Sequence, residues 1–362
     1  MAARRIENAW WTLVVPPAGA LAATSIILTL ISSGQPLVAI ILALLIGSSV
    51  FAAVHHAEII AARTGEPYGS IVLALAVTVL EVGLILSLML GKPDGGPTIA
   101  RDTVYLGIMI ITTGIIGLSL LFGSRRHFEQ SLRIRGTSSA LAVLIVLAVI
   151  TLILPNYTVA TTGPTLSKVQ LVMVALTSLV LYCVFLFVQT VRHREYFLPE
   201  AELDNDQAIP ATRTLWVSVA MLSAALFAVI FLAKALSPLL GSAIAYAGLP
   251  DSFTGVVIAA LVLMPEGIAA VRAALANRLQ VSINLALGSG LATIGLTIPA
   301  VAIADLIGGF NIVLGISPAQ TALLMLALFV SAITLNNGRT NILFGAIHLS
   351  IFAMFLLISA VP

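Results

Sequence analysis

The chain has 362 residues, of which 60% are hydrophobic and only 9% are charged, and its net charge is +2. Because a soluble domain carries about 25% charged residues, this composition excludes a soluble globular protein. The mean hydropathy of +1.12 predicts an integral membrane protein. The small net charge does not indicate a nucleic acid partner. The single cysteine, Cys183, lies in an apolar run, which excludes a disulfide framework and a thiolate metal site.

The apolar residues form about eleven continuous stretches, each long enough to cross a bilayer as a helix of about 20 residues. Hydrophobic and polar residues do not alternate within them, so they are not strands of a membrane barrel. The expected spans are residues 10–32, 36–62, 68–90, 103–123, 139–155, 168–191, 214–236, 253–275, 281–307, 317–335 and 341–361. The sequence therefore predicts an all-α polytopic membrane protein.

The distribution of basic residues predicts the orientation of these spans. The N-terminal segment has no small-residue cleavage site behind a short apolar core, so we expect the first helix to be retained. Positive residues gather on the cytoplasmic side of membrane proteins. With the N-terminus in the cytoplasm, all of the 17 Lys and Arg fall on that side except Lys92, Arg101, Lys168 and Lys234. The C-terminus is then expected on the outside.

A long cytoplasmic loop with several acidic residues divides the chain into two halves of five spans. The resulting segments are 1–35 (N-terminal tail and first helix), 36–191 (first repeat), 192–213 (acidic loop) and 214–362 (second repeat). PYGSIVLALAVTVLE in the first half aligns with SFTGVVIAALVLMPE in the second, which places Glu81 on Glu266. Repeats of five spans have opposite orientations, as in secondary transporters. The loop is expected to be a solvated linker, with a cation sensor as the alternative.

Three of the 15 acidic residues lie inside spans: Glu58, Glu81 and Glu266. A charged side chain at mid-bilayer costs about 3 kcal/mol on insertion scales, so such residues mark functional sites by default. Glu81 and Glu266 lie at matching depth in symmetry-related spans, which predicts a pair that binds cations or protons. A structural role, with each acid hydrogen-bonded to a neighbouring helix, is the alternative.

Pro265 directly precedes Glu266 inside an apolar span. Proline has no N–H and its ring pushes on the carbonyl four residues back, which is that of Leu261. Loosening the helix there frees a backbone oxygen beside a carboxylate, and hard cations bind several such oxygens. In the first half Thr78, one turn before Glu81, offers a hydroxyl instead. An ordinary proline kink is the alternative.

Two further hydroxyl residues are candidates for the same site. Ser289 lies between two glycines in INLALGSGLATIGLTIPAV, and Thr113 lies in IMIITTGIIGLSL. Hydroxyls can line a polar site, whereas small residues also allow helices to pack closely. Both interpretations stay open at this point.

His55, His56 and Glu58 form a cluster near the cytoplasmic end of the second span. Histidine titrates near neutral pH, so the cluster is a candidate proton relay or gate. A polar anchor for the helix end is an equal alternative. A zinc site is less favoured, because no HExxH motif exists and His348 is the one other histidine expected within a span.

Two runs, AEIIAARTGEPYGSIVLALAVTVLE and MPEGIAAVRAALANRLQVSINLALGSGLATIGLTIPAV, resemble the ChaA-type branch of the calcium/cation antiporter superfamily. The resemblance covers the second to the eleventh span. It implies a bacterial inner-membrane antiporter that exchanges Ca²⁺, Na⁺ or K⁺ for protons and has two inverted five-helix repeats. It also implies that Glu81 and Glu266 bind the ion, and it places a family acid on Glu58.

The chain departs from the wider superfamily where neutral ligands are expected. The departures are Val77-Thr78 and Val262-Leu263 in place of Gly-Asn before each glutamate, Ala292 in place of Gln, and Thr113 in place of Asn. Fewer neutral oxygen ligands imply a looser site or a monovalent ion. A cation/proton antiporter is therefore favoured over a dedicated calcium exchanger.

The expected mechanism is exchange by competition, in which Glu81 and Glu266 face each other near the midplane. Each binds a proton or part of a cation, and rocking of one helix bundle exposes the site alternately, so that proton influx drives cation efflux. Lipid, inorganic cations and protons are the expected partners, with no cofactor and no nucleic acid, and the sequence leaves the oligomeric state open. The alternatives are a membrane-embedded metal-dependent enzyme built on His55, His56 and Glu58, or a passive cation channel.

Overall fold

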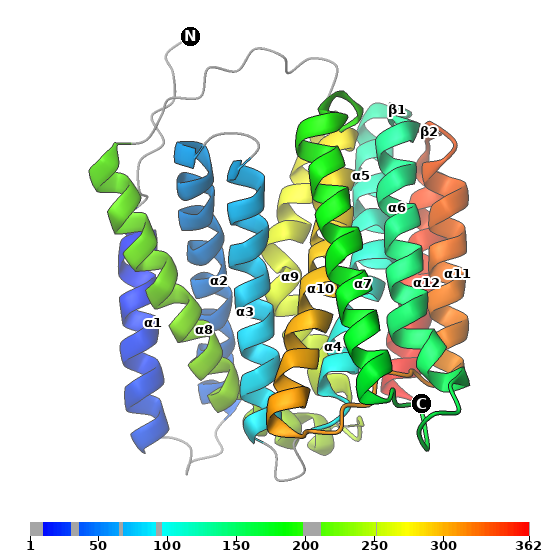
Figure 1. The fold of residues 1–362 in the computed structure, drawn as a ribbon. Helices are drawn as coiled ribbons and strands as arrows, with labels where there is room; N and C mark the ends of the chain where they lie inside the picture. The colour runs from blue at the N-terminus through cyan, green and yellow to red at the C-terminus, as the bar shows by residue number, and fades with distance from the viewer. Residues whose placement is uncertain are drawn as a thin grey trace. The chain divides into compact units, whose positions relative to one another are not determined.

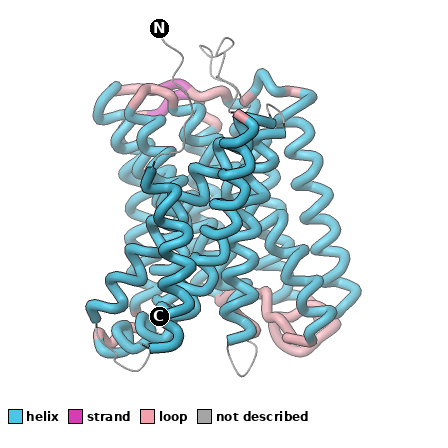
Figure 2. The backbone as a smooth tube through the Cα atoms, turned by 90° about the vertical axis from the view of Figure 1, so that its left-hand side faces the viewer, coloured by secondary structure: helices cyan, strands magenta, loops and turns pink. Residues whose placement is uncertain are grey.

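The computed structural model describes residues 10–29, 36–64, 68–91, 96–197, 211–250 and 252–361. Within these ranges the chain is helical almost throughout, apart from one pair of short strands (Figure 2). Nine helices of the described chain are long and apolar enough to cross a membrane. The expectation of an all-helical polytopic membrane protein is confirmed. Most of the acidic loop, residues 198–210, lies outside the described ranges.

The chain forms two compact units, and each is made of two segments that are not consecutive in the sequence. Unit 1 comprises Met1–Gly91 and Glu202–Pro265, and unit 2 comprises Lys92–Ala201 and Glu266–Pro362. Each unit therefore takes its helices from both halves of the chain. The segments 1–35, 36–191, 192–213 and 214–362 describe the sequence, and their two repeats stay a prediction. The point of division falls between Pro265 and Glu266.

Unit 1 is a group of long apolar helices in which α2 packs on α1, α3 and α8 (Figure 1). Its elements are α1 (Trp10–Thr29), α2 (Pro36–Thr64), α3 (Tyr68–Gly91), α8 (Thr212–Tyr246) and the first part of α9 (Ser252–Leu275). Its core includes Ile46 of α2, Leu84 of α3, Leu232 of α8 and Val262 of α9. Burial of such side chains contributes about 1.5–3 kcal/mol each in water, whereas in lipid close packing replaces this term.

Unit 2 contains the remaining helices and both strands. Its elements are α4 (Ile99–Met109), η1 (Ile110–Ile115), α5 (Ile116–His127), β1 (Gln130–Ser131), α6 (Ile134–Ala148), η2 (Val149–Ile153), η3 (Leu154–Tyr157), α7 (Lys168–Phe187), η4 (Val188–Arg192), η5 (Arg194–Tyr196), the second part of α9, α10 (Leu279–Gly308), α11 (Pro318–Leu335), β2 (Arg339–Thr340) and α12 (Ile342–Ala360). The strands are antiparallel, with Gln130 opposite Thr340. Three of these elements, η1, η2 and η4, are π-helical turns within longer spans.

Several spans are longer than hydropathy predicts. The seventh was expected to end at residue 236, but α8 continues through Pro238 to Tyr246. The fourth was expected over 103–123, but the continuous helix runs from Ile99 to His127. The added turns carry charged or small polar residues and proline, which lower local hydropathy without ending a helix.

Candidate cation-binding site

In unit 1, α3 carries Thr78 and Glu81 on one face, because residues three apart in a helix are neighbours. Their side chains are only 6% and 7% exposed. The leucines next to them, Leu80 and Leu84, belong to the apolar core that α3 forms with α2, α8 and α9. The predicted carboxyl and hydroxyl of the first half are therefore enclosed by protein.

Leu261 and Pro265 lie within α9, which is a continuous helix from Ser252 to Leu275. Leu261 is partly buried against the core of unit 1. Pro265 cannot donate to the Leu261 carbonyl because proline has no N–H. The helix therefore continues through this point, but it lacks the backbone N–H of residue 265, one residue before Glu266.

Glu266 begins the part of α9 that belongs to unit 2. Its Oε2 atom is buried and has no hydrogen-bond partner among the described residues. Burying a carboxylate without a partner is costly, and the cost is removed by a proton or by a bound cation. Glu266 therefore has the environment of a group that binds one or the other.

Glu266 and Ser289 each precede a glycine that packs on the π-helical turn containing Thr113, so the three residues lie on neighbouring segments of unit 2. A Cβ added to Gly267 would lie 3.4 Å from Cδ1 of Ile115 in η1, and one added to Gly290 would lie 3.6 Å from Cδ1 of Ile111. The residues that follow Glu266 and Ser289 therefore pack directly on the π-helical turn that contains Thr113. Both distances are ordinary van der Waals contacts, so the helices are packed closely but without strain.

The two hydroxyls of this neighbourhood differ in their hydrogen bonds. Thr113 is fully buried and its Oγ1 donates to the Met109 carbonyl one turn earlier. Because its proton is used in this bond, the oxygen can act only as an acceptor toward other groups. The Oγ of Ser289 is buried and has no partner among the described residues. The packing of the neighbouring glycines is observed, whereas a role of the two hydroxyls in lining an ion site stays a prediction.

The three residues of the cluster near the end of the second span, His55, His56 and Glu58, differ in their burial and their hydrogen bonds. His56 is fully buried, with Nε2 2.9 Å from the Thr12 carbonyl and Nδ1 3.3 Å from Ser218 Oγ. The ring of His55 lies 5.6 Å from that of His56, and Nε2 of His55 has no partner among the described residues. Glu58 is exposed. In the described part of the chain, no three His, Cys, Asp or Glu side chains form a group that could hold a metal ion.

One buried polar group was not assigned a role from the sequence. His348 of α12 is fully buried in unit 2, with Nδ1 2.7 Å from the Thr112 carbonyl and Nε2 3.3 Å from Thr334 Oγ1. It is a histidine in a predominantly apolar span, which was the signal available in the sequence. The π-helical turn that it contacts has no such signal.

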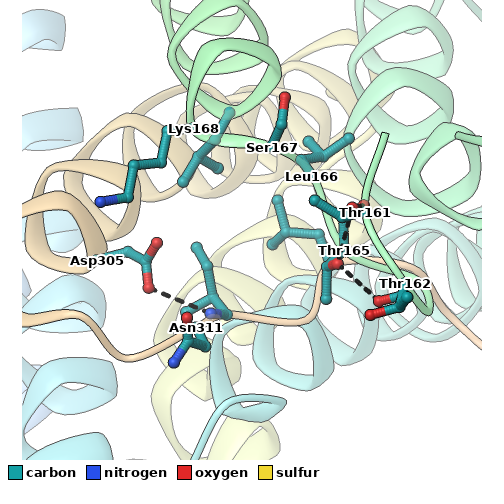
Figure 3. A pocket seen from close by; sticks show the side chains of 11 residues that line it. Thr161, Thr162, Thr165, Leu166, Ser167, Lys168, Asp305 and Asn311 are labelled. Carbon is teal, nitrogen blue, oxygen red and sulfur yellow. Dashed lines mark hydrogen bonds between the residues drawn. The ribbon is translucent and has the colours of Figure 1, made fainter. Parts of the chain in front are cut away.

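A polar pocket of about 500 Å³ lies elsewhere in unit 2 (Figure 3). Threonine hydroxyls line one side of it, and Lys168 and Asp305 line the other. Asp305 Oδ1 accepts a hydrogen bond from the Ile312 N–H at 3.2 Å. Because an ammonium and a carboxylate share this pocket, their charges offset one another and do not favour a free cation. None of the predicted ion-binding residues lines the pocket.

Comparison with known proteins identifies the family. Residues 35–191 and 217–361 match the sodium/calcium exchanger protein family. The chain belongs to this family. It is 39% identical over 343 residues to the sodium-potassium/proton antiporter ChaA of Escherichia coli (strain K12), with 92% of each chain covered. It is 48% identical over 353 residues to a protein of Sinorhizobium fredii (strain NBRC 101917 / NGR234) described as an ionic transporter, covering 97% of this chain and 96% of the relative.

Solved structures show that this exchanger shares its fold with other members. The structure of native YfkE superposes with a TM-score of 0.75 at 17% identity, covering 97% of this chain and all of that one. The H⁺/Ca²⁺ exchanger CAX gives a TM-score of 0.69 at 16% identity, covering 95% of this chain and 87% of that one. Its family match and its 39% identical relative show that the exchanger is a multi-pass membrane protein of the calcium/cation antiporter superfamily and not an enzyme. Its activity is secondary-active cation exchange.

Proposed function

We propose that this chain exchanges a metal cation for protons, and that Glu81 and Glu266 bind the two in competition. The observation that carries the proposal is the buried Oε2 of Glu266, which has no partner among the described residues. An ionised carboxylate in this position needs a counter-charge. A proton and a cation can each supply it, and the same oxygen cannot hold both.

The groups around the two acids support a site with oxygen ligands. Thr78 accompanies Glu81 on α3, while Thr113 and Ser289 accompany Glu266 in unit 2, and the Leu261 carbonyl lacks the donor that Pro265 cannot supply. Hard cations such as Ca²⁺ bind several oxygen ligands. With hydroxyls in place of amides, the site suits Na⁺ or K⁺ as well as Ca²⁺. The sodium-potassium/proton antiporter of E. coli, as a 39% identical relative, supports the monovalent ions.

The cycle couples the two fluxes because the empty site carries uncompensated negative charge. A doubly ionised pair is unfavourable within the membrane, so the site changes its exposure only after protons or a cation have bound. With a proton gradient directed inward, proton influx drives cation efflux. We propose a bacterial inner-membrane location with the N-terminus in the cytoplasm and the C-terminus in the periplasm, because the relatives are bacterial and basic residues favour the inside.

His55, His56 and Glu58 are proposed to act beside this site rather than in it. Glu58 is exposed, and both ring nitrogens of His56 have partners in unit 1. A proton relay through the cluster would therefore use Glu58 and His55, with His56 holding the helices. A Glu58→Gln variant that slows exchange while leaving the half-saturating cation concentration unchanged would support a relay, and an unchanged rate would remove it.

The test uses everted membrane vesicles with an acid interior and a fluorescent pH probe. Ca²⁺, Na⁺ and K⁺ are added in turn to vesicles with the wild type, Glu81→Gln, Glu266→Gln or the surface control Glu129→Gln. We expect at least one cation to collapse the gradient with the wild type and the control but not with the two site variants. No collapse with any cation, or collapse that survives in both site variants, would contradict the proposal.

A further inference from the structure

The fourth span contains a π-helical turn that moves one backbone donor, the Ile116 N–H, away from the Thr112 carbonyl. In an α-helix the Ile116 N–H would donate to the Thr112 carbonyl, but here it donates to Ile111, five residues back. Inside a membrane, a carbonyl that loses its usual helical donor needs another one. All six residues of the turn are buried, so water is not a ready substitute.

His348 supplies a donor at this carbonyl. A carbonyl oxygen only accepts, so Nδ1, at 2.7 Å, carries the proton and donates to Thr112. In the neutral ring Nε2 is then an acceptor, and the Thr334 hydroxyl, at 3.3 Å, is its donor. Both ring nitrogens are used, and one tautomer satisfies both contacts.

Two glycines of the fourth span, Gly114 and Gly117, let α12 approach closely enough for His348 to reach the turn. A Cβ added to Gly117 would lie 3.0 Å from Cβ of His348, and one added to Gly114 would lie 3.2 Å from the ring of Phe352. Small residues let helices approach closely enough for such side-chain bonds. The turn also contacts α10, which carries Ser289, so it lies between the histidine and the proposed ion ligands.

We propose that His348 is a positioning residue for cation binding, because its bond to Thr112 holds the π-helical turn that orients the Thr113 hydroxyl. The inference rests on the proposed function, in which Thr113 is a ligand. Each residue occupies roughly 100° of an α-helix, so a turn that returned to the α-helical pattern would point Thr113 in a different direction. Turns of this kind recur at functional sites.

The variants test whether His348 acts as a hydrogen-bond donor or only fills space between the helices. His348→Leu fills the space without a donor, whereas His348→Asn places an N–H close to the position of Nδ1 and His348→Gln places one near Nε2. The vesicle assay gives a half-saturating concentration and a maximal rate for the cation to which the wild type responds best. Ser350→Ala is the matched control, since this exposed hydroxyl on the same helix bonds only its own helix, at the Ala346 carbonyl.

We expect His348→Leu to raise the half-saturating cation concentration about three- to eighteen-fold, the size of a typical to strong hydrogen bond between membrane helices. The maximal rate per folded transporter should stay within about twofold, and His348→Asn and the control should match the wild type. A half-saturating concentration that is unchanged in His348→Leu overturns the inference. If that variant does not fold, equal behaviour of His348→Asn and His348→Gln overturns it.

A double-mutant cycle distinguishes this inference from the function on which it rests. If His348 acts through Thr113, His348→Leu adds no further loss of affinity in a Thr113→Val background, since the two changes act on one group. Additive losses would show that His348 acts elsewhere. A Thr113→Val variant with unchanged affinity would instead remove Thr113 from the proposed site, whatever the result at His348.

Discussion

His56 donates a hydrogen bond to the Thr12 carbonyl, the oxygen that Pro16 would have satisfied had it carried an N–H. Nε2 lies 2.9 Å from that oxygen, and Pro16 lies four residues after Thr12 within α1. His348 has the same relationship to Thr112 in unit 2, where a π-helical turn rather than a proline removes the donor. Each unit thus contains a buried histidine that caps a carbonyl released by a helix irregularity.

This relationship predicts different effects on stability for substitutions of two neighbouring histidines. His56→Phe should lower the stability of the transporter by about 0.6–1.7 kcal/mol, the range for a hydrogen bond between membrane helices. His55→Phe should lower it less or raise it, because Nε2 of His55 is buried without a partner among the described residues. Thermal unfolding of the purified variants in detergent measures both. Equal losses would show that the Thr12 bond contributes nothing specific.

The contact between α5 and α12 depends on a glycine. A Cβ added to Gly345 would lie 2.5 Å from the backbone nitrogen of Leu121, which cannot move aside. Gly345→Ala should therefore destabilise the protein by about 1–3 kcal/mol, the cost of overpacking.

The matched control is Gly241→Ala in α8, where no described atom lies within 4 Å of the added Cβ. There alanine should stabilise the helix by about 0.5–1 kcal/mol. Melting temperatures that shift in opposite directions would support both assignments, whereas a neutral Gly345→Ala would contradict the close packing.

The hydroxyl ligands predict changes in affinity rather than in folding. Thr113→Val keeps the shape of the side chain and removes the oxygen, so the half-saturating cation concentration should rise about tenfold, as for the loss of one good polar contact. Ser289→Ala should have a similar or smaller effect. Cation titration of the vesicle signal measures both, and a fall in maximal rate with unchanged affinity would argue against a ligand role.

Competition between protons and cations predicts the direction of the pH dependence. At lower pH more of the site carboxyls are protonated, so the apparent affinity for the cation should fall while the maximal occupancy stays the same. If one proton is displaced per cation, the half-saturating concentration rises at most about tenfold per pH unit. Equilibrium cation binding measured at several pH values tests this, and an affinity independent of pH would contradict it.

The spans and the candidate acids could be predicted because both follow from the energetics of a bilayer. Long apolar runs leave few alternatives to helices, and Glu81 and Glu266 are conspicuous because charge is costly there. The seventh and fourth spans were predicted too short, since serine, proline and charged residues in the added turns lower the local hydropathy without ending the helix.

The roles of His56 and His348 could not be predicted, because they depend on which backbone carbonyl loses its helical N–H donor and on which side chain then lies close to it. Pro16 was visible in the sequence, yet the histidine that compensates it comes from another helix. The π-helical turn at Ile110–Ile115 has no local signature, since threonine and glycine in an apolar span are also ordinary packing residues. Such pairings are set by tertiary packing.

Proton release on cation binding tests the central claim most directly. Purified wild type in detergent, in weakly buffered solution near neutral pH, is titrated with Ca²⁺, Na⁺ or K⁺ while a dye reports free protons. Competition predicts that the cation that binds releases protons from the wild type and from Glu129→Gln, and that Glu81→Gln and Glu266→Gln release fewer. Cation binding that releases no protons, or release that is unchanged in both site variants, would contradict exchange by competition at these two glutamates.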